Sequence, residues 1–140
     1  MIQSPFRTAL TPREVADAAW YDHLRLNERL EETERLVAAG DFAGAVRVFD
    51  RFSFDLNGHI EIEERVLFPD LDRAAESPGG NPTAVLRREH AEIRRLAEAT
   101  AAAIRVRHPD RFCGAIGALR DVLESHTDRE ERLFSGRNRS

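Results

Sequence analysis

Cysteine is almost absent from this chain, and its scarcity excludes two kinds of site. Cys113 is the only cysteine among 140 residues, so one copy of the chain forms neither an internal disulfide nor a thiolate cluster that binds a metal. It directly follows Phe112 in an amphipathic stretch, where an unpaired cysteine usually packs as a small hydrophobe. We therefore expect Cys113 to have a packing role and not a redox role.

Lysine is missing altogether, and so is any surplus of positive charge. All 21 basic residues are arginine, they are interleaved with Asp and Glu, and the formal net charge is -4. A nucleic-acid-binding protein usually gathers its basic residues into a patch or stripe. We therefore expect neither nucleic acid nor an anionic membrane as a partner.

Long hydrophobic runs are the third absence. No segment is apolar over the length that a transmembrane helix requires, and residues 1–7 lack the apolar core of a secretion signal. We therefore predict a cytoplasmic protein. The length of the chain corresponds to a single domain, residues 1–140.

The chain is rich in Arg, Glu and Ala, which enter a helix at little cost in free energy, and two helices are predicted in its first half. Thr11-Pro12-Arg13-Glu14 is a capping box that begins the first helix, and Gly40 ends it. Asp41 caps the second helix. Pro69 should kink or end this helix, because proline lacks a backbone N–H and crowds the preceding turn.

Two further helices are predicted in the second half. Asn81 is the expected cap of the third helix and Pro82 its first residue, and a break at residues 108–110 separates it from the fourth. Four amphipathic helices with mostly short connections predict an all-α, up-down-up-down four-helix bundle. Its helical core should cover residues of about 11–134, with frayed or disordered ends outside it.

The motif His-x-x-x-Glu-Glu-Arg occurs twice, at residues 59–65 and 126–132. Residues four apart lie on the same face of a helix, so each copy directs an imidazole and a carboxylate toward one point. Both copies fall on the apolar faces of their helices, as do His23 and His90 on the other two helices. Each of the four predicted helices therefore turns one histidine toward the core.

The depth of these residues in the bundle brings them together. With a rise of about 1.5 Å per residue, the four histidines lie roughly 24–28 Å from the same end of the bundle. By the same rise, Glu63 and Glu130 lie about 6 Å deeper, from where each carboxylate can reach back to the histidines. One layer of four imidazoles and two carboxylates is therefore predicted.

A core of mutually hydrogen-bonded His–Glu pairs is the competing interpretation, since a neutral imidazole needs few partners. A buried carboxylate, however, is costly unless it is paired or bound to a cation, and convergence from four helices favours a metal centre. Glu131 remains an alternative to Glu130, because helix register inferred from sequence is loose. Glu64 is expected in solvent or behind a ligand. The predicted metal ligands are His23, His59, Glu63, His90, His126 and Glu130.

Imidazole and carboxylate ligands without thiolate suit iron, manganese or zinc. Six ligands are too many for one tetrahedral zinc ion, and they divide naturally into two histidines per metal with two bridging carboxylates. Open positions on both ions would then be available to oxygen, peroxide or nitric oxide. The residues that flank the layer and are placed to orient the imidazoles are Trp20, Tyr21, Asp22 and Asn57.

These motifs resemble those of hemerythrin-like, HHE cation-binding domains, over essentially all of the predicted helices. The residues that carry the resemblance are Asp22-His23, His59-x-x-x-Glu63-Glu64-x-x-Leu67-Phe68-Pro69, Glu89-His90, and His126-x-x-x-Glu130-Glu131 followed by Leu133-Phe134. The resemblance implies a centre of two non-haem iron ions, with the four histidines as terminal ligands and the two glutamates as bridges. Manganese or zinc are possible substitutes for the iron.

The chain departs from the oxygen-carrying hemerythrins, whose third helix supplies two histidines four residues apart. Arg94 follows His90 at that spacing and Leu86 precedes it. The set of four histidines and two glutamates is instead similar to that of repair-of-iron-centres proteins and iron-sensing hemerythrin-like domains. Repair proteins commonly add an N-terminal region with cysteine, which the residues before the first helix do not match.

The resemblance therefore implies a small di-iron protein that binds or reduces O2, peroxide or NO in the response to oxidative or nitrosative stress. Its partner would be that diatomic or peroxide ligand. A non-catalytic iron or oxygen sensor, or an iron-storage module, is the alternative. A reversible oxygen carrier is disfavoured by Arg94, whose four-residue offset from His90 predicts that it faces the core.

Overall fold

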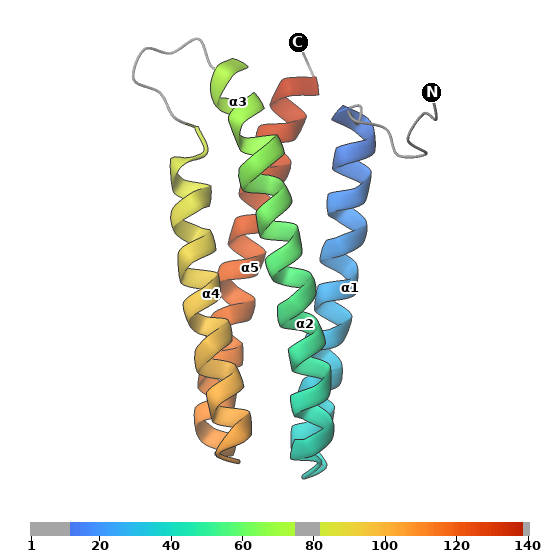
Figure 1. Cartoon of the computed structure of the whole chain (residues 1–140), viewed down its shortest axis with the longest axis vertical. Helices are drawn as coiled ribbons and strands as arrows, with labels where there is room; N and C mark the ends of the chain where they lie inside the picture. The colour runs from blue at the N-terminus through green and yellow to red at the C-terminus, as the bar shows by residue number, and fades with distance from the viewer. Residues whose placement is uncertain (1–11, 75–81, 139–140) are drawn as a thin grey trace, which may run out of the picture.

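The fold is a bundle of long helices (Figure 1). The computed structural model describes residues 12–74 and 82–138, with the side chains of residues 22–73 and 82–133, and it contains no strand within these ranges. The elements are α1 (Pro12–Ala38), α2 (Phe42–Ile62), the π-helical turn η1 (Glu63–Leu67), α3 (Phe68–Ala74), α4 (Ala84–Arg105) and α5 (Pro109–Asn138). Because α2, η1 and α3 form one continuous rod, the predicted all-α, up-down-up-down bundle is confirmed.

The turn between α1 and α2 forms as the sequence predicts. Gly40 has a positive φ of 78°, a conformation that glycine adopts without a steric penalty, and α1 ends just before it. Asp41 caps α2, since its Oδ1 accepts a hydrogen bond of 2.9 Å from the backbone N–H of Gly44. These two residues reverse the chain and make α1 and α2 antiparallel neighbours.

Two predicted helix ends are corrected. The third helix, α4, begins at Ala84 after Thr83, two residues later than predicted, and Asn81 lies outside the described residues. The Thr83 hydroxyl donates to Asp72 Oδ2 over 2.8 Å, which ties the start of α4 to α3. The last helix, α5, continues to Asn138 and so passes the predicted end near residue 134. Thr11 and the termini predicted to fray, apart from residues 135–138 of α5, lie outside the described residues.

Pro69 affects the chain through the turn that precedes it. In a regular α-helix the carbonyl of Arg65 would accept a hydrogen bond from the backbone N–H of residue 69. Proline has no N–H, and its ring would crowd that carbonyl. The chain instead forms η1, in which the Phe68 N–H donates to the carbonyl of Glu63, five residues back. The helical rod then continues through α3, so Pro69 distorts the helix without ending it.

The extra residue in η1 changes which side chains face inward. Val66, which the α-helical pattern places on the buried stripe, is 54% exposed, whereas Phe68 is fully buried.

Cys113 on α5 is exposed, contrary to the packing role expected from the sequence. It lies about 100° around α5 from the buried Phe112, because successive residues in an α-helix are separated by that angle.

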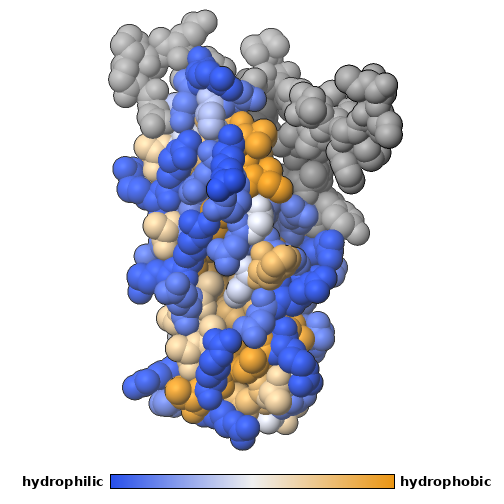
Figure 2. Space-filling view, in the orientation of Figure 1, coloured by the Kyte–Doolittle hydropathy of each residue, from blue (hydrophilic) through white to orange (hydrophobic). Residues whose placement is uncertain are grey.

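Two apolar clusters enclose a polar layer in the bundle. The larger cluster includes Leu30, Phe49, Phe52 and Ile104, and the smaller consists of Phe68, Leu71 and Leu86 with two partly buried leucines. The face of the molecule seen in Figure 2 is mostly hydrophilic, with hydrophobic residues visible between the hydrophilic ones. Among the described helices none has the combination of length and apolarity that crossing a membrane requires.

Candidate metal centre

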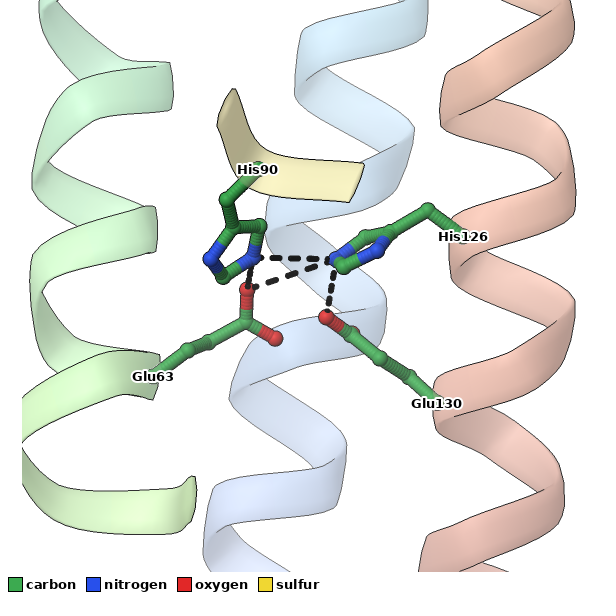
Figure 3. Close-up of side chains that lie close together, drawn as sticks. All are labelled: Glu63, His90, His126 and Glu130. Atoms are coloured by element: carbon green, nitrogen blue, oxygen red, sulfur yellow. Dashed lines mark hydrogen bonds and ion pairs between the residues drawn. The ribbon is translucent and has the colours of Figure 1, made fainter. Parts of the chain in front are cut away.

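All four predicted histidines and both glutamates meet inside the bundle. Glu63 Oε1 lies 3.3 Å from His59 Nε2, 3.0 Å from His90 Nε2 and 3.8 Å from His126 Nε2. Glu130 Oε1 lies 2.5 Å from His126 Nε2. Figure 3 shows the carboxyl groups of Glu63 and Glu130 reaching toward the rings of His90 and His126 from two different helices.

The remaining histidine, His23, joins the cluster through the second oxygen of Glu130. Its Nε2 lies 3.6 Å from Glu130 Oε2, and its ring packs edge-on against that of His59 at a centroid distance of 5.0 Å. The histidines thus form two pairs, His23 with His59 and His90 with His126, and Glu130 contacts a member of each.

Two overlapping groups of these residues bring their ligand atoms within 4.8 Å of one another. One consists of Glu63, His90, His126 and Glu130, all buried, and the other of His23, His59 and Glu130. Glu130 belongs to both groups, as a carboxylate between two ions would. Glu131, the alternative to Glu130, is exposed at the surface of α5 and takes no part.

The outward nitrogens of three imidazoles contact carboxylates from other helices. His59 Nδ1 lies 3.3 Å from Asp22 Oδ2, His90 Nδ1 lies 3.0 Å from Glu64 Oε1, and His126 Nδ1 lies 3.2 Å from Glu89 Oε1. A carboxylate that accepts the Nδ1–H proton fixes the tautomer that presents Nε2 to a metal. The three contacts therefore turn Nε2 of each ring toward the centre.

These contacts partly match the residues that the sequence placed beside the histidine layer. Asp22 contacts a histidine as expected, and Glu64 lies behind a ligand, whereas Asn57 contacts Arg94 instead. The side chains of Trp20 and Tyr21 lie outside the described ones. Glu89 was missed, although its position directly before His90 places it on the side of α4 that faces α5.

Arg94 does not face the core, contrary to expectation. Its Nε donates to Asn57 Oδ1 over 3.3 Å, and its Nη2 lies 3.8 Å from Glu61 Oε1. The buried face of α4 is centred on the side of Ile93 and Ala97, so a residue four positions after His90 falls on the flank. Arg94 therefore links α4 to α2 at the surface and is no part of the metal centre.

Burial controls the protonation of the two central carboxyl groups. Burial raises the pKa of Glu63 well above its usual value, and the neighbouring Glu130 adds to the shift. Burial alone would also raise the pKa of Glu130, but contacts with Glu63 and His126 outweigh it and lower that pKa to about 2. In the absence of a metal, Glu130 is therefore an anion, and burial favours the protonated form of Glu63 more than that of an ordinary glutamate.

The imidazoles respond to burial in different ways. Burial opposes the charged form of His126, yet Glu130 and Glu63 beside it outweigh this effect and raise its pKa to about 10. Burial lowers the pKa of His90 to about 4, and Glu64 opposes the shift only in part. Burial also lowers the pKa of His23. Without a metal, a His126–Glu130 ion pair thus lies beside the neutral imidazoles of His90 and His23.

Several polar atoms of the cluster are buried without a hydrogen-bond partner. His23 Nδ1 and Glu63 Oε2 are two of them. The others are His59 Nε2 and both carboxylate oxygens of Glu130, which make ion-pair contacts but no hydrogen bond. A buried polar atom without a partner costs free energy, so such a concentration requires an explanation. A cation at the centre would contact most of these atoms, since imidazole nitrogens and carboxylate oxygens are ligands for iron, manganese and zinc. The residues present therefore fit a metal centre.

A cleft between α1 and α5 reaches the edge of the centre. It encloses about 330 Å³ and is lined by His23 together with Leu26, Glu31, Leu123, Glu124 and Asp128, among others. His23 is the most exposed of the six predicted ligands, at 14%. The cleft thus connects solvent with the His23 side of the cluster.

Comparison with known families supports this geometry. Residues 15–137 match the family described as the hemerythrin HHE cation binding domain. The chain belongs to this family. Neither the curated proteins nor the solved structures gave a significant match. Membership indicates metal-cation binding, and the His/Glu cluster of this HHE domain is a group of residues that can hold the metal.

We expect metal binding to the HHE domain to release a proton from His126, because its pKa of about 10 keeps it protonated at neutral pH and a ligand must be deprotonated. The raised pKa of Glu63 acts in the same direction. A raised pKa means that the proton is lost only as the pH rises, so Co²⁺ affinity should increase with pH until it approaches about 10, the pKa of His126. Calorimetric titration in two buffers of different ionisation enthalpy measures the protons released. A binding enthalpy that is the same in both buffers would contradict this protonation pattern.

The metal should also stabilise the fold, because it binds the native state and relieves the buried carboxylates. At a metal concentration 100 times Kd, one site contributes about 2.7 kcal/mol. For a chain of this length that raises Tm by about 5–10 °C. Glu130→Gln should abolish most of the rise and Glu131→Gln should retain it, as measured by calorimetry with and without Co²⁺. Equal shifts in the two variants would show that Glu130 is not a ligand.

Proposed function

We propose that this HHE domain binds two iron ions and uses them to bind or reduce O2, peroxide or NO in a cytoplasmic response to oxidative or nitrosative stress. The observation that carries the proposal is the pair of overlapping His/Glu groups that share Glu130. The terminal ligands would be His23, His59, His90 and His126, with Glu63 and Glu130 as bridges. Bound iron would supply redox and Lewis-acid chemistry.

The residues around the centre favour access by small molecules over access by large ones. Apolar clusters lie on both sides of the layer and exclude water from its buried side. The α1–α5 cleft offers access beside His23, and its lining carries three carboxylates, Glu31, Glu124 and Asp128, against one guanidinium, Arg120, a balance that admits cations as well. Diatomic molecules and peroxide fit such a route, because the centre itself lies behind buried side chains.

The number of protein ligands would leave the two metal ions able to bind a further molecule. Six protein ligands, two of them bridging, leave coordination positions on both ions for an added molecule. Arg94 is held by Asn57 and lies 3.8 Å from Glu61, so α4 contributes His90 alone from this side. The proposal therefore favours a reactive centre over the more fully ligated centre of a reversible oxygen carrier.

Protein loaded anaerobically with Fe²⁺ should contain about two iron atoms per chain, as carboxylate-bridged bundles of this kind do. His59→Ala and His126→Ala should each lose at least one iron atom by elemental analysis. His108→Ala is the matched control, because His108 is exposed in the turn between α4 and α5 and belongs to neither group of clustered residues. Full iron content in the His59 and His126 variants would show that these residues are core histidines.

Peroxide and NO consumption by the loaded protein then separates the proposed activity from its alternative. Turnover that disappears in His126→Ala but persists in His108→Ala would support a reactive di-iron centre. Iron binding without consumption of either molecule, or of O2, would favour the sensor or storage module.

A further inference from the structure

The two copies of the His-x-x-x-Glu-Glu motif are used differently. In a regular α-helix, adjacent residues are separated by about 100°, so only one of two neighbouring glutamates faces a given partner. The copy on α5 follows this rule, with Glu130 buried and Glu131 exposed. In the other copy, both glutamates contact the same side chain.

His90 is the side chain that Glu63 and Glu64 share. Glu63 Oε1 lies 3.0 Å from His90 Nε2, and Glu64 Oε1 lies 3.0 Å from His90 Nδ1. One imidazole is thus contacted on both nitrogens by two adjacent residues. Among the described residues, His90 is the only partner of the Glu64 carboxylate, whereas Glu89 behind His126 is also contacted by Arg129 Nε at 3.3 Å.

The π-helical turn η1 explains this double contact. It spans Glu63–Leu67 and places one extra residue in the turn, which alters the angle between neighbouring side chains. Phe68 consequently takes the inward position that Leu67 would have in an α-helix. Its ring stacks on His90 at a centroid distance of 5.2 Å and an interplanar angle of 15°. Glu63 and Glu64 of this turn, together with Phe68 directly after it, therefore enclose the ring of His90.

We propose that Glu64 is a positioning residue for His90 and that the π-turn η1 is the structural device that brings it there. The carboxylate accepts the Nδ1–H proton, which leaves the Nε2 lone pair directed at the centre, while Phe68 holds the plane of the ring. The inference rests on the proposed metal function, and it assigns Glu64 and Glu131 different roles although they occupy the same place in the repeated motif.

The decisive experiment compares Co²⁺ binding to the metal-free full chain in wild type, Glu64→Gln and Glu131→Gln. Loss of a carboxylate behind a histidine ligand typically lowers metal affinity by about 10–100-fold. Glu64→Gln should show a loss of about 10-fold or more, and Glu131→Gln should bind like wild type. Equal affinity in all three proteins would overturn the inference while leaving the metal function intact.

A spectroscopic measurement separates positioning from general stability. In the Zn²⁺-loaded wild type, the Nδ1–H proton of His90 should give a protected signal in the proton NMR spectrum. Glu64→Ala should lose that signal, whereas Glu64→Gln should retain it weakly, because the amide oxygen still accepts the proton. A signal unchanged in Glu64→Ala would show that Glu64 does not hold the ring.

Deleting Val66 tests the role of the π-turn itself. Val66 is exposed, and removing one residue restores an α-helical count between Glu63 and Phe68, so both should keep their places while Glu64 turns away. Co²⁺ affinity should fall by the same factor as in Glu64→Gln, and adding Glu64→Gln to the deletion should cause no further loss. Additive losses would show that the turn does not act through Glu64.

The comparison of Glu64→Gln with Glu131→Gln decides the role of Glu64 even if the deletion variant does not fold. The same titrations also separate the two proposals. If wild type binds Co²⁺ no more tightly than His59→Ala and His126→Ala do, the metal function is wrong and the inference falls with it. If wild type binds through these histidines and Glu64→Gln binds equally well, only the inference is wrong.

Discussion

Burial of two carboxyl groups in the middle of an apolar bundle is the constraint on which the rest of this structure depends. Glu63 and Glu130 are each 1% exposed, and desolvation of such groups costs free energy unless a positive charge accompanies them. Without a metal, the raised pKa of Glu63 favours its protonated form, and Glu130 pairs with the charged His126. A cation would replace those protons. The fold is therefore expected to be less stable without a metal than with one.

The surroundings hold this layer in place. Apolar clusters on both sides fix the helices, and carboxylates on Asp22, Glu64 and Glu89 turn the imidazoles inward. Because each of these contacts joins two different helices, orientation of the ligands and packing of the bundle depend on each other. Each outer carboxylate therefore acts on the central layer through the imidazole that it contacts.

The helical periodicity of the sequence made the bundle and the layer of six side chains predictable, because residues such as His126 and Glu130 are spaced as in a regular α-helix. The sequence pattern failed where the chain leaves that spacing. Val66 was expected inside and is exposed, since η1 adds a residue that no count of 3.6 per turn reveals. The predicted burial of Arg94 and Cys113 was wrong for a related reason. Both lie on the flank of an apolar stripe, where a difference of one position around the helix decides burial.

Pro69 links the local irregularity to the centre. It directly follows Phe68 and lacks an N–H, so one helical donor is missing just after η1, and in this π-turn Glu64 lies behind His90. The α5 copy of the motif has no proline at the equivalent distance, remains α-helical and leaves Glu131 in solvent. His126 then needs a carboxylate from elsewhere, and Glu89 on α4 provides it. The two copies of the motif are thus used differently, and for the α5 copy the carboxylate behind the histidine comes from a residue on another helix.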